Sequence, residues 1–257
     1  MGVFDIKGVY KAYVNTKGDK AKIVLQDVNL TVNENEFLCI LGPSGCGKTT
    51  LLNMMAGFEF PLKGEVLFKG KKVEGPGSDR GVIFQEYSLM PWTDVQKNVA
   101  FGINRKKYNE KERMALALEY LDLVGLRDVA KNRPNSLSGG MKQRVAIART
   151  LAMEPDALLM DEPFCSLDEQ TKKHMDAEIL RLWNANKTTV VFITHSIDEA
   201  LSLGTRIVLM SRSPGKFVKS WELPADMDRN HNSDQYLRLR DEIYDALINV
   251  DNKLKED

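Results

Sequence analysis

The sequence contains no run of eighteen or more apolar residues, so no segment is expected to cross a lipid bilayer by itself. It also lacks an excess of either charge, because 36 basic residues balance 36 acidic ones. Proteins that bind nucleic acids are usually strongly basic, and the balance therefore argues against DNA or RNA as a partner. The N-terminus shows neither an uninterrupted apolar stretch nor a small-residue cleavage site, so it does not read as a secretory signal.

Cysteine is scarce as well. The three cysteines, Cys39, Cys46 and Cys165, form neither a metal-ligand spacing nor an even set for disulfides. This usage fits a protein of the reducing cytosol. What the chain does have is 257 residues with an ordinary 43% of hydrophobic residues, which suits one large domain or one domain with a small appendage.

Short apolar runs alternate with amphipathic helical patterns along most of the chain. The runs at residues 37–41, 157–160 and 188–193 are typical of strands buried on both faces of a sheet. Helical patterns lie between them, one at 48–56 and another from Met114 to Leu121 that ends at Gly125. The alternation predicts an α/β fold with a parallel sheet flanked by helices.

Both ends of the chain carry further elements. Residues 3–10 and 23–32 read as strands of an antiparallel N-terminal sheet, joined by a polar turn at 15–20. Pro134 breaks a helical pattern and marks an expected joint between subdomains at 133–136. A strand-like segment at 217–223 precedes a last helix, and the charged residues 251–257 are expected to fray.

A glycine-rich loop follows the first buried run. Residues 42–49, GPSGCGKT, match the pattern G-x-x-x-x-G-K-[ST] between a strand and a helix. In such a loop the backbone N–H groups point at phosphate oxygens, and the helix adds its positive N-terminal end. Lys48 is expected to neutralise the β- and γ-phosphates, and the Thr49 hydroxyl to coordinate Mg²⁺. The alternative is a glycine-rich turn that binds nothing, which the flanking strand and helix disfavour.

Two acids end another apolar run. Asp161 and Glu162 follow residues 157–160, and buried carboxylates without partners are costly in a core. The pair makes better sense in a site, where Asp161 holds Mg²⁺ and Glu162 polarises the attacking water. The alternative is a strand-end pair that caps a neighbouring helix.

Residues 137–144, LSGGMKQR, narrow the choice among nucleotide hydrolases. They resemble the signature motif of ABC ATPases, and Gln85, Asp168 and His195 complete the motif set of that family in order. The chain thus resembles the ATP-binding subunit of an ABC transporter over essentially its whole length. The resemblance implies that two such domains pack head to tail, with each ATP between the phosphate loop of one subunit and the signature of the other.

The signature also has a reading from its residues alone. Ser138, Gly139 and Gly140 open a helix, expected at 141–153, whose N-terminus can face a γ-phosphate. A serine N-cap followed by two loop glycines describes the same local pattern, although it leaves the double glycine unexplained.

The resemblance implies the remaining roles. Gln85 looks like the glutamine that contacts Mg²⁺ or water and senses the membrane subunit, Asp168 lies in the loop that crosses the dimer interface, and His195 looks like the histidine that bonds the γ-phosphate. The implied catalytic residues are Glu162, His195, Gln85 and Lys48, and the implied Mg²⁺ ligands are Thr49, Gln85 and Asp161. The implied ATP-binding residues are Tyr13, Gly42, Pro43, Ser44, Gly45, Cys46, Gly47, Lys48, Thr49, Thr50, Ser138, Gly139, Gly140 and Asp168.

One of these positions carries an alternative, and another a testable prediction. Tyr13 stands where the family places a ring that stacks on adenine, but Tyr10 is a close rival, and either ring could instead pack against the sheet. Cys46 lies inside the phosphate loop beside Lys48, so alkylation there is expected to block hydrolysis, with bound ATP protecting the thiol.

One departure points to a subfamily. Met141 replaces the glutamine of the signature consensus, and residues 88–101, SLMPWTDVQKNVAF, resemble importers of nitrate, sulfonates, taurine, bicarbonate or pyrimidine precursors. The substitution is not expected to abolish hydrolysis.

The segment that follows Gln85 is also where importers of this family dock the coupling helix of the permease. Its large apolar residues are expected to form that socket or, alternatively, to fill the joint between subdomains; they are Leu89, Met90, Pro91, Trp92 and Phe101, in a stretch that reads as rich in loops.

The expected protein is therefore a single ABC nucleotide-binding domain over 1–250, with a helical subdomain at about 92–153 and a charged tail at 251–257. Its implied cofactors are ATP and Mg²⁺. Its implied partners are a second identical copy, an integral-membrane permease and, indirectly, an extracytoplasmic solute-binding protein, at the cytoplasmic face of the membrane. Exporters, importers of pyrimidine or thiamine precursors and non-transport ABC ATPases remain the alternatives, although sustained heptads and a second cassette are absent from the sequence.

Overall fold

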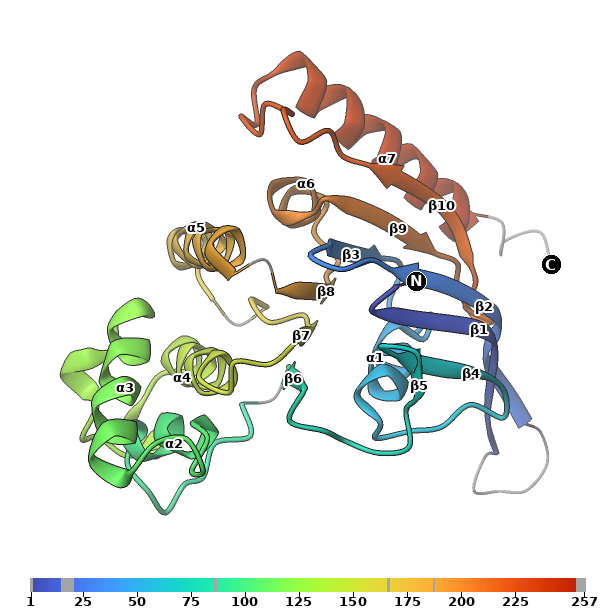
Figure 1. Cartoon of the computed structure of the whole chain (residues 1–257). Helices are drawn as coiled ribbons and strands as arrows, with labels where there is room; N and C mark the ends of the chain where they lie inside the picture. The colour runs from blue at the N-terminus through green and yellow to red at the C-terminus, as the bar shows by residue number, and fades with distance from the viewer. Residues whose placement is uncertain (1, 15–20, 86, 166, 187, 253–257) are drawn as a thin grey trace. The chain divides into compact units, whose positions relative to one another are not determined.

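The computed structural model describes residues 2–14, 21–85, 87–165, 167–186 and 188–252 (Figure 1). The chain divides into two units, one made of Met1–Pro76 with Thr189–Asp257 and the other of Gly77–Thr188. The first unit is thus built from two separate stretches of sequence, and the second from one continuous stretch.

An antiparallel sheet forms one part of the first unit. Its strands are β1 (Phe4–Val14), β2 (Ala21–Val32), β4 (Lys63–Phe68) and β5 (Lys71–Lys72), in the order β2-β1-β4-β5. The predicted N-terminal pair is confirmed, but β1 continues to Val14 because its last residues still pair with β2, as Tyr13 does with Lys22. The polar turn predicted at 15–20 lies outside the described residues.

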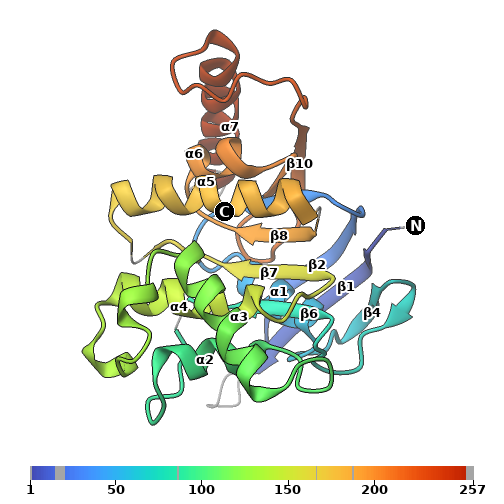
Figure 2. The same cartoon turned by 60° about the vertical axis from the view of Figure 1, so that its left-hand side comes forward.

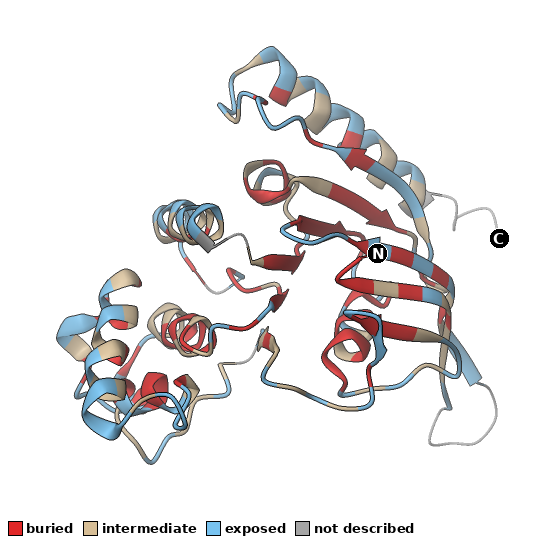
Figure 3. Ribbon diagram, in the orientation of Figure 1, coloured by how far each residue is buried: buried red, intermediate tan, exposed pale blue. Residues whose placement is uncertain are grey.

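Parallel strands form the other part of the first unit. The central strand β3 (Phe37–Leu41) pairs in parallel with β8 (Thr189–Ile193) on one side and with β9 (Arg206–Met210) on the other. The strand β10 (Phe217–Glu222) then adds to β9 in antiparallel direction. Every residue of β3 and β8 is buried, as the continuous apolar runs predicted (Figure 3).

Three helices complete the first unit. They are α1 (Lys48–Ala56), α6 (Ile197–Leu203) and α7 (Asp234–Asn252). Helix α1 has the predicted bounds, with Gly47 and Gly57 in left-handed conformations at its two ends. Helix α7 extends into the segment predicted to fray, and residues 253–257 lie outside the described part of the chain.

The second unit joins a short parallel pair to a group of helices. Strands β6 (Arg80–Ile83) and β7 (Ala157–Asp161) pair in parallel, and α2 (Val95–Gly102) packs against α3 (Glu110–Leu123) and α4 (Gly139–Leu151) (Figure 2). Two short 3₁₀ turns, Arg127–Val129 and Pro134–Ser136, lie before α4, and α5 (Glu169–Asn186) closes the unit. The parallel strands, the helices and the separate antiparallel sheet confirm the predicted α/β class.

Two helix positions differ from the prediction. The signature helix α4 begins at Gly139 rather than at 141, because the Ser138 hydroxyl accepts a hydrogen bond from the Met141 N–H at 3.3 Å and so caps the first turn. The stretch at 88–101, which reads as rich in loops, is helical after Asp94, within the range of about 92–153 predicted for the helical subdomain. Helix α2 begins directly after this residue, whose carboxylate accepts from the Lys97 N–H at 2.7 Å. None of the helices in the described part of the chain is both long and apolar enough to span a bilayer.

Candidate functional site

The phosphate loop connects β3 to α1 in the first unit. The Lys48 side chain is only 6% exposed, and its ammonium donates to the carbonyls of Gly42 at 2.7 Å and Pro43 at 3.0 Å. These two hydrogen bonds hold the charge inside the loop that it is expected to serve. Ser44, Gly45 and Thr49 are exposed at the loop surface, so the loop presents backbone and hydroxyl groups to solvent.

The underside of the loop rests on two distant segments. Gly47 has φ +102°, and a Cβ there would lie 2.6 Å from Leu25 Cδ2 of β2. A Cβ on Gly215 would lie 2.1 Å from the Cys46 carbonyl oxygen. Gly215 also donates its N–H to the Val24 carbonyl at 2.7 Å, which ties the segment after β9 to β2. Glycine is therefore required at both positions, because other segments of the same chain approach too closely to leave room for a side chain.

Cys46 is not accessible in this loop. Its side chain is fully buried, with Sγ 3.8 Å from the Lys48 ammonium. Burial raises the pKa of the Cys46 thiol, and the nearby Lys48 offsets this only in part. The sequence-based expectation of a reactive thiol is therefore wrong for this conformation: alkylation at Cys46 requires the loop to open first.

Tyr13 lies near the end of β1. It is 41% exposed, and its hydroxyl donates to the Glu59 carboxylate. Lys11 reaches the same carboxylate at 3.0 Å and lies 5.2 Å from the centre of the Tyr13 ring. Tyr10 is half-buried and lies under Lys63 instead. The ring of Tyr13 is thus the more exposed of the two candidates and is held at its hydroxyl end, with Lys11 beside it.

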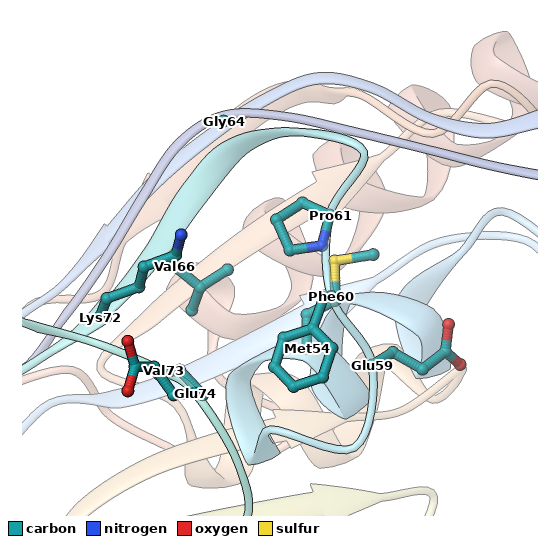
Figure 4. Close-up of a pocket in the computed structure, with 9 residues that line it drawn as sticks. All are labelled: Met54, Glu59, Phe60, Pro61, Gly64, Val66, Lys72, Val73 and Glu74. Atoms are coloured by element: carbon teal, nitrogen blue, oxygen red, sulfur yellow. The ribbon is translucent and has the colours of Figure 1, made fainter.

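Glu59 was not foreseen from the sequence as part of the site. It follows α1 in the chain and lines a pocket of about 260 Å³, in which Met54, Phe60 and Pro61 lie together while its carboxylate points outward (Figure 4). Burial raises the pKa of this carboxyl, but the hydrogen bonds from Tyr13 and Lys11 lower it by more than burial raises it, so that the net shift of the pKa is downward. Glu59 therefore stays ionised and keeps its hold on Tyr13 at neutral pH.

The family resemblance implies that Tyr13 stacks on adenine, and removing this hold should then weaken adenine binding alone. We expect Glu59→Ala to raise the KM for ATP about threefold to tenfold, since a hydrogen bond to a charged group contributes roughly 1.5–3 kcal/mol and only part of it acts on the bound state. The turnover number should stay within about twofold. Steady-state kinetics on the variant test this. The matched control is Glu65→Ala on β4, an acid that pairs with Lys7 at 3.6 Å; an unchanged KM in Glu59→Ala would contradict the assignment.

His195 lies at the same edge of the parallel strands as the phosphate loop. Ile40 and Ile193 are register partners in β3 and β8, so the segments that follow both strands leave at one carboxyl edge. The turn that carries His195 after β8 is held by hydrogen bonds of the two residues that flank it, Thr194 and Ser196. The Ser196 N–H donates to Thr194 Oγ1 at 3.0 Å, and Thr194 Oγ1 donates to the Glu199 carboxylate at 2.5 Å.

The second unit contributes the acidic strand end. Asp161 closes the buried strand β7 and is 7% exposed. Glu162, the next residue, has φ +45°, a conformation that costs a residue with a side chain about 1–3 kcal/mol and turns the chain out of the strand direction. Gln85 follows β6, which pairs in parallel with β7, and Gln143 Nε2 donates to the Phe84 carbonyl at 3.3 Å just before it. Gln85, Asp161 and Glu162 therefore lie at one carboxyl edge.

The signature residues and Asp168 belong to the same unit. Ser138 is exposed and caps α4, and a Cβ on Gly139 would lie 2.7 Å from the Tyr87 hydroxyl. Asp168 accepts hydrogen bonds from the N–H and the hydroxyl of Thr171, at 2.9 and 2.7 Å, and these bonds lower the pKa of its carboxyl. The structure thus describes every candidate residue, with one group at strand ends and loops of the first unit and another in the second.

Comparisons with known proteins identify the family of the chain. A family model described as "ABC transporter" matches residues 25–165. The chain is 44% identical over 251 residues to the bicarbonate transport ATP-binding protein CmpD of Synechocystis, which covers 95% of this chain and 88% of that protein. It is 43% identical over 232 residues to the nitrate import ATP-binding protein NrtD of Synechococcus elongatus, covering 88% and 85%. It is 50% identical over 196 residues to the taurine import ATP-binding protein TauB of Sinorhizobium fredii, covering 76% and 73%.

A solved structure shares the fold. It is a dimeric ATP-binding cassette in a post-hydrolysis state, bound to ADP and Pi. The similarity has a TM-score of 0.78 at 34% identity, and it covers 86% of this chain and 99% of that cassette.

Proposed function

Because the chain belongs to the ABC transporter family and is one of its ATP-hydrolysing cassettes, we propose that it energises import of a small anion of the nitrate, sulfonate, taurine or bicarbonate type. The observation that carries this proposal is the near full-length similarity to proteins named for transport of bicarbonate and import of nitrate and taurine. The sequence of residues 88–101, which resembles that of the same importers, supports this subfamily.

We assign binding of ATP to the first unit. Lys48 neutralises the β- and γ-phosphates from within the loop, and the loop N–H groups bind their oxygens. Tyr13 stacks on adenine while Glu59 holds its hydroxyl. His195 donates to the γ-phosphate from the turn after β8.

Hydrolysis needs the second unit. Glu162 is the proposed general base for the attacking water, and Gln85 positions that water or the metal. The donors at Thr49, Gln85 and Asp161 are all oxygens, the ligand type that Mg²⁺ prefers, and a few protein oxygens completed by nucleotide phosphates fit this ion. Mg²⁺ would supply charge neutralisation at the phosphates.

The proposed active form is a homodimer. Ser138, Gly139 and Gly140 lie at the N-terminus of α4, which suits binding of a γ-phosphate held by another subunit. Asp168 would lie at the subunit interface. The dimeric state of the similar solved cassette supports this arrangement.

A surface of the second unit fits a permease. A hollow of about 330 Å³ is lined by residues from α2, α3 and the segment before them, including Met90, Trp92 and Phe101. Trp92 is 73% exposed and Phe101 57% exposed, so these two rings do not fill an interior joint. Exposed aromatic side chains beside a hollow are typical of interface anchors. The chain would thus bind the cytoplasmic face of a membrane through an integral-membrane permease, itself served by an extracytoplasmic solute-binding protein.

Trp92→Ala should separate docking from catalysis. We expect the amount of permease that co-purifies with the variant to fall at least about tenfold. Truncating an anchor residue typically costs about 2 kcal/mol or more of binding free energy. Basal ATPase activity of the isolated chain should not change. The control is Phe58→Ala, a second exposed ring at 47% exposure in the first unit. Loss of folding together with assembly in Trp92→Ala would argue for a structural role instead.

The importer proposal is tested by identifying the partner. The tagged chain is purified from gently solubilised membranes, and mass spectrometry identifies what accompanies it. A multi-span permease encoded beside a solute-binding protein is the expected result. Recovery with ribosomes or chromatin, or without any membrane protein, would overturn the transport proposal and leave the ATPase.

A further inference from the structure

The segment between β10 and α7 holds α6 at its C-terminal end. Helix α6 has seven residues, and its last carbonyl groups have no partners within the helix. The Arg229 guanidinium donates to three carbonyls there, those of Leu201 at 2.8 Å, Ser202 at 2.7 Å and Gly204 at 2.9 Å. One planar cation thus satisfies the end of this short helix.

A second side chain holds the other end of α6. Tyr236, in the first turn of α7, is completely buried, and its hydroxyl donates to Asp198 Oδ1 at 2.8 Å. His231 stacks on the Tyr236 ring with centroids 4.6 Å apart, and its Nε2 lies 3.3 Å from Ser202 Oγ. Burial and the adjacent Asp198 raise the pKa of the phenol, so the hydroxyl remains a donor at any physiological pH.

Asp198 lies in the first turn of α6, three residues after His195. Ser196 caps α6 by accepting from the Glu199 N–H at 3.2 Å. Glu199 is in turn bound by Thr194, the residue immediately before the histidine. A contact made at Asp198 therefore acts on a segment, residues 194–199, whose two ends are joined by these hydrogen bonds.

We propose that Tyr236 and Arg229 are positioning residues that fix α6 and thereby hold the His195 turn in place for the γ-phosphate. The proposal rests on the proposed role of His195 in hydrolysis. Neither residue touches the nucleotide in this scheme. Tyr236 fixes the first turn of α6, which follows the His195 turn. Arg229 prevents the C-terminal end of α6 from fraying, which would loosen the His195 turn.

A purely structural role would predict something different. The Asp198 carboxylate is exposed, so removing its partner leaves no buried charge. The Tyr236 ring would still fill its site if the hydroxyl alone were removed. Loss of the hydroxyl should therefore leave the fold intact and be felt where the turn acts.

The experiment compares Tyr236→Phe with Tyr244→Phe in the full chain. Tyr244 lies on the same helix but is 58% exposed, which makes it a matched control. We expect Tyr236→Phe to lower kcat for ATP about tenfold, with KM within about twofold, because small displacements of a catalytic group mainly affect the rate. The variant should stay folded, with a melting temperature lowered by only about a few degrees for the lost hydrogen bond. Tyr244→Phe should match the parent protein.

Asp198→Ala supplies an independent reading from the other partner. Asp198→Ala should reproduce the fall in kcat. The double variant should be no slower than either single variant, since both substitutions remove the same hydrogen bond. An unchanged kcat in Asp198→Ala overturns the proposal, even where Tyr236→Phe fails to fold. His195→Ala distinguishes failure of the positioning proposal from failure of the proposed role of His195. If His195→Ala retains full hydrolysis, the proposed role of His195 itself fails. If it abolishes hydrolysis while Tyr236→Phe and Asp198→Ala stay active, only the positioning proposal fails.

Discussion

Replacing Glu162 with glutamine should lower kcat for ATP hydrolysis by about 10²–10⁴-fold, the range typical for loss of a positioned general base. The amide has the size and shape of the carboxylate, so the chain direction set by φ +45° at this residue is not disturbed. Binding of ATP should persist, because the groups assigned to phosphate and adenine lie elsewhere. Since the bound nucleotide is no longer consumed, a nucleotide-held dimer should accumulate.

Three measurements check this result: turnover under saturating ATP, equilibrium binding of ATP, and size-exclusion chromatography with ATP present. Glu154→Gln is a matched control, because Glu154 is an acid in the same unit with φ +49° whose side chain is exposed at the surface. It should hydrolyse ATP at the parent rate. A Glu162→Gln protein that turns over at more than about a tenth of that rate would exclude Glu162 as the base.

Gly47→Ala should nearly abolish nucleotide binding. A side chain at φ +102° is strained by about 1–3 kcal/mol. The new methyl carbon would also lie 2.6 Å from Leu25 Cδ2, and forced overpacking of this kind costs about 1–3 kcal/mol more. Since the strain falls on the residue before Lys48, the loop can relieve it only by giving up the conformation that binds phosphate.

Gly45→Ala separates the two contributions. Gly45 also has a positive φ, +75°, but no atom lies within 4 Å of a Cβ placed there. We expect Gly45→Ala to weaken ATP affinity about tenfold or less, and Gly47→Ala to weaken it by at least about a hundredfold. Isothermal calorimetry on both variants measures the difference, with circular dichroism to verify folding. Equal losses in the two variants would mean that the contact with Leu25 does not shape the loop.

The phosphate loop and α1 were predictable from the sequence for a local reason. Strand, glycine loop and helix are consecutive, and the glycines at 47 and 57 bound the helix without help from distant residues. The same holds for the buried strand β8, whose five residues are all apolar or β-branched. Patterns of this kind depend on neighbours in the chain, which is the information that a sequence displays.

Other features depend on contacts between distant positions. Glu59 and Tyr13 are 46 positions apart, and they meet just beyond the paired part of β1 and β4, whose register ends at Tyr10 and Lys63. The reactive thiol expected at Cys46 failed for a related reason: burial in a loop is decided by the segments beneath it, here Leu25 and Gly215. The functional roles assigned to the candidate residues remain proposals for the variants above to test.

The discontinuous make-up of the first unit has a consequence for the order of folding. Residues 77–188 are continuous, so a ribosome releases this unit whole before the strands β8 and β9 exist. The phosphate loop, although made early, rests on Gly215 and lies after β3, whose two parallel neighbours arrive about 150 and 170 residues after it. The nascent chain therefore carries an unfinished first unit through most of its synthesis, and its ability to hold ATP is acquired among the last steps.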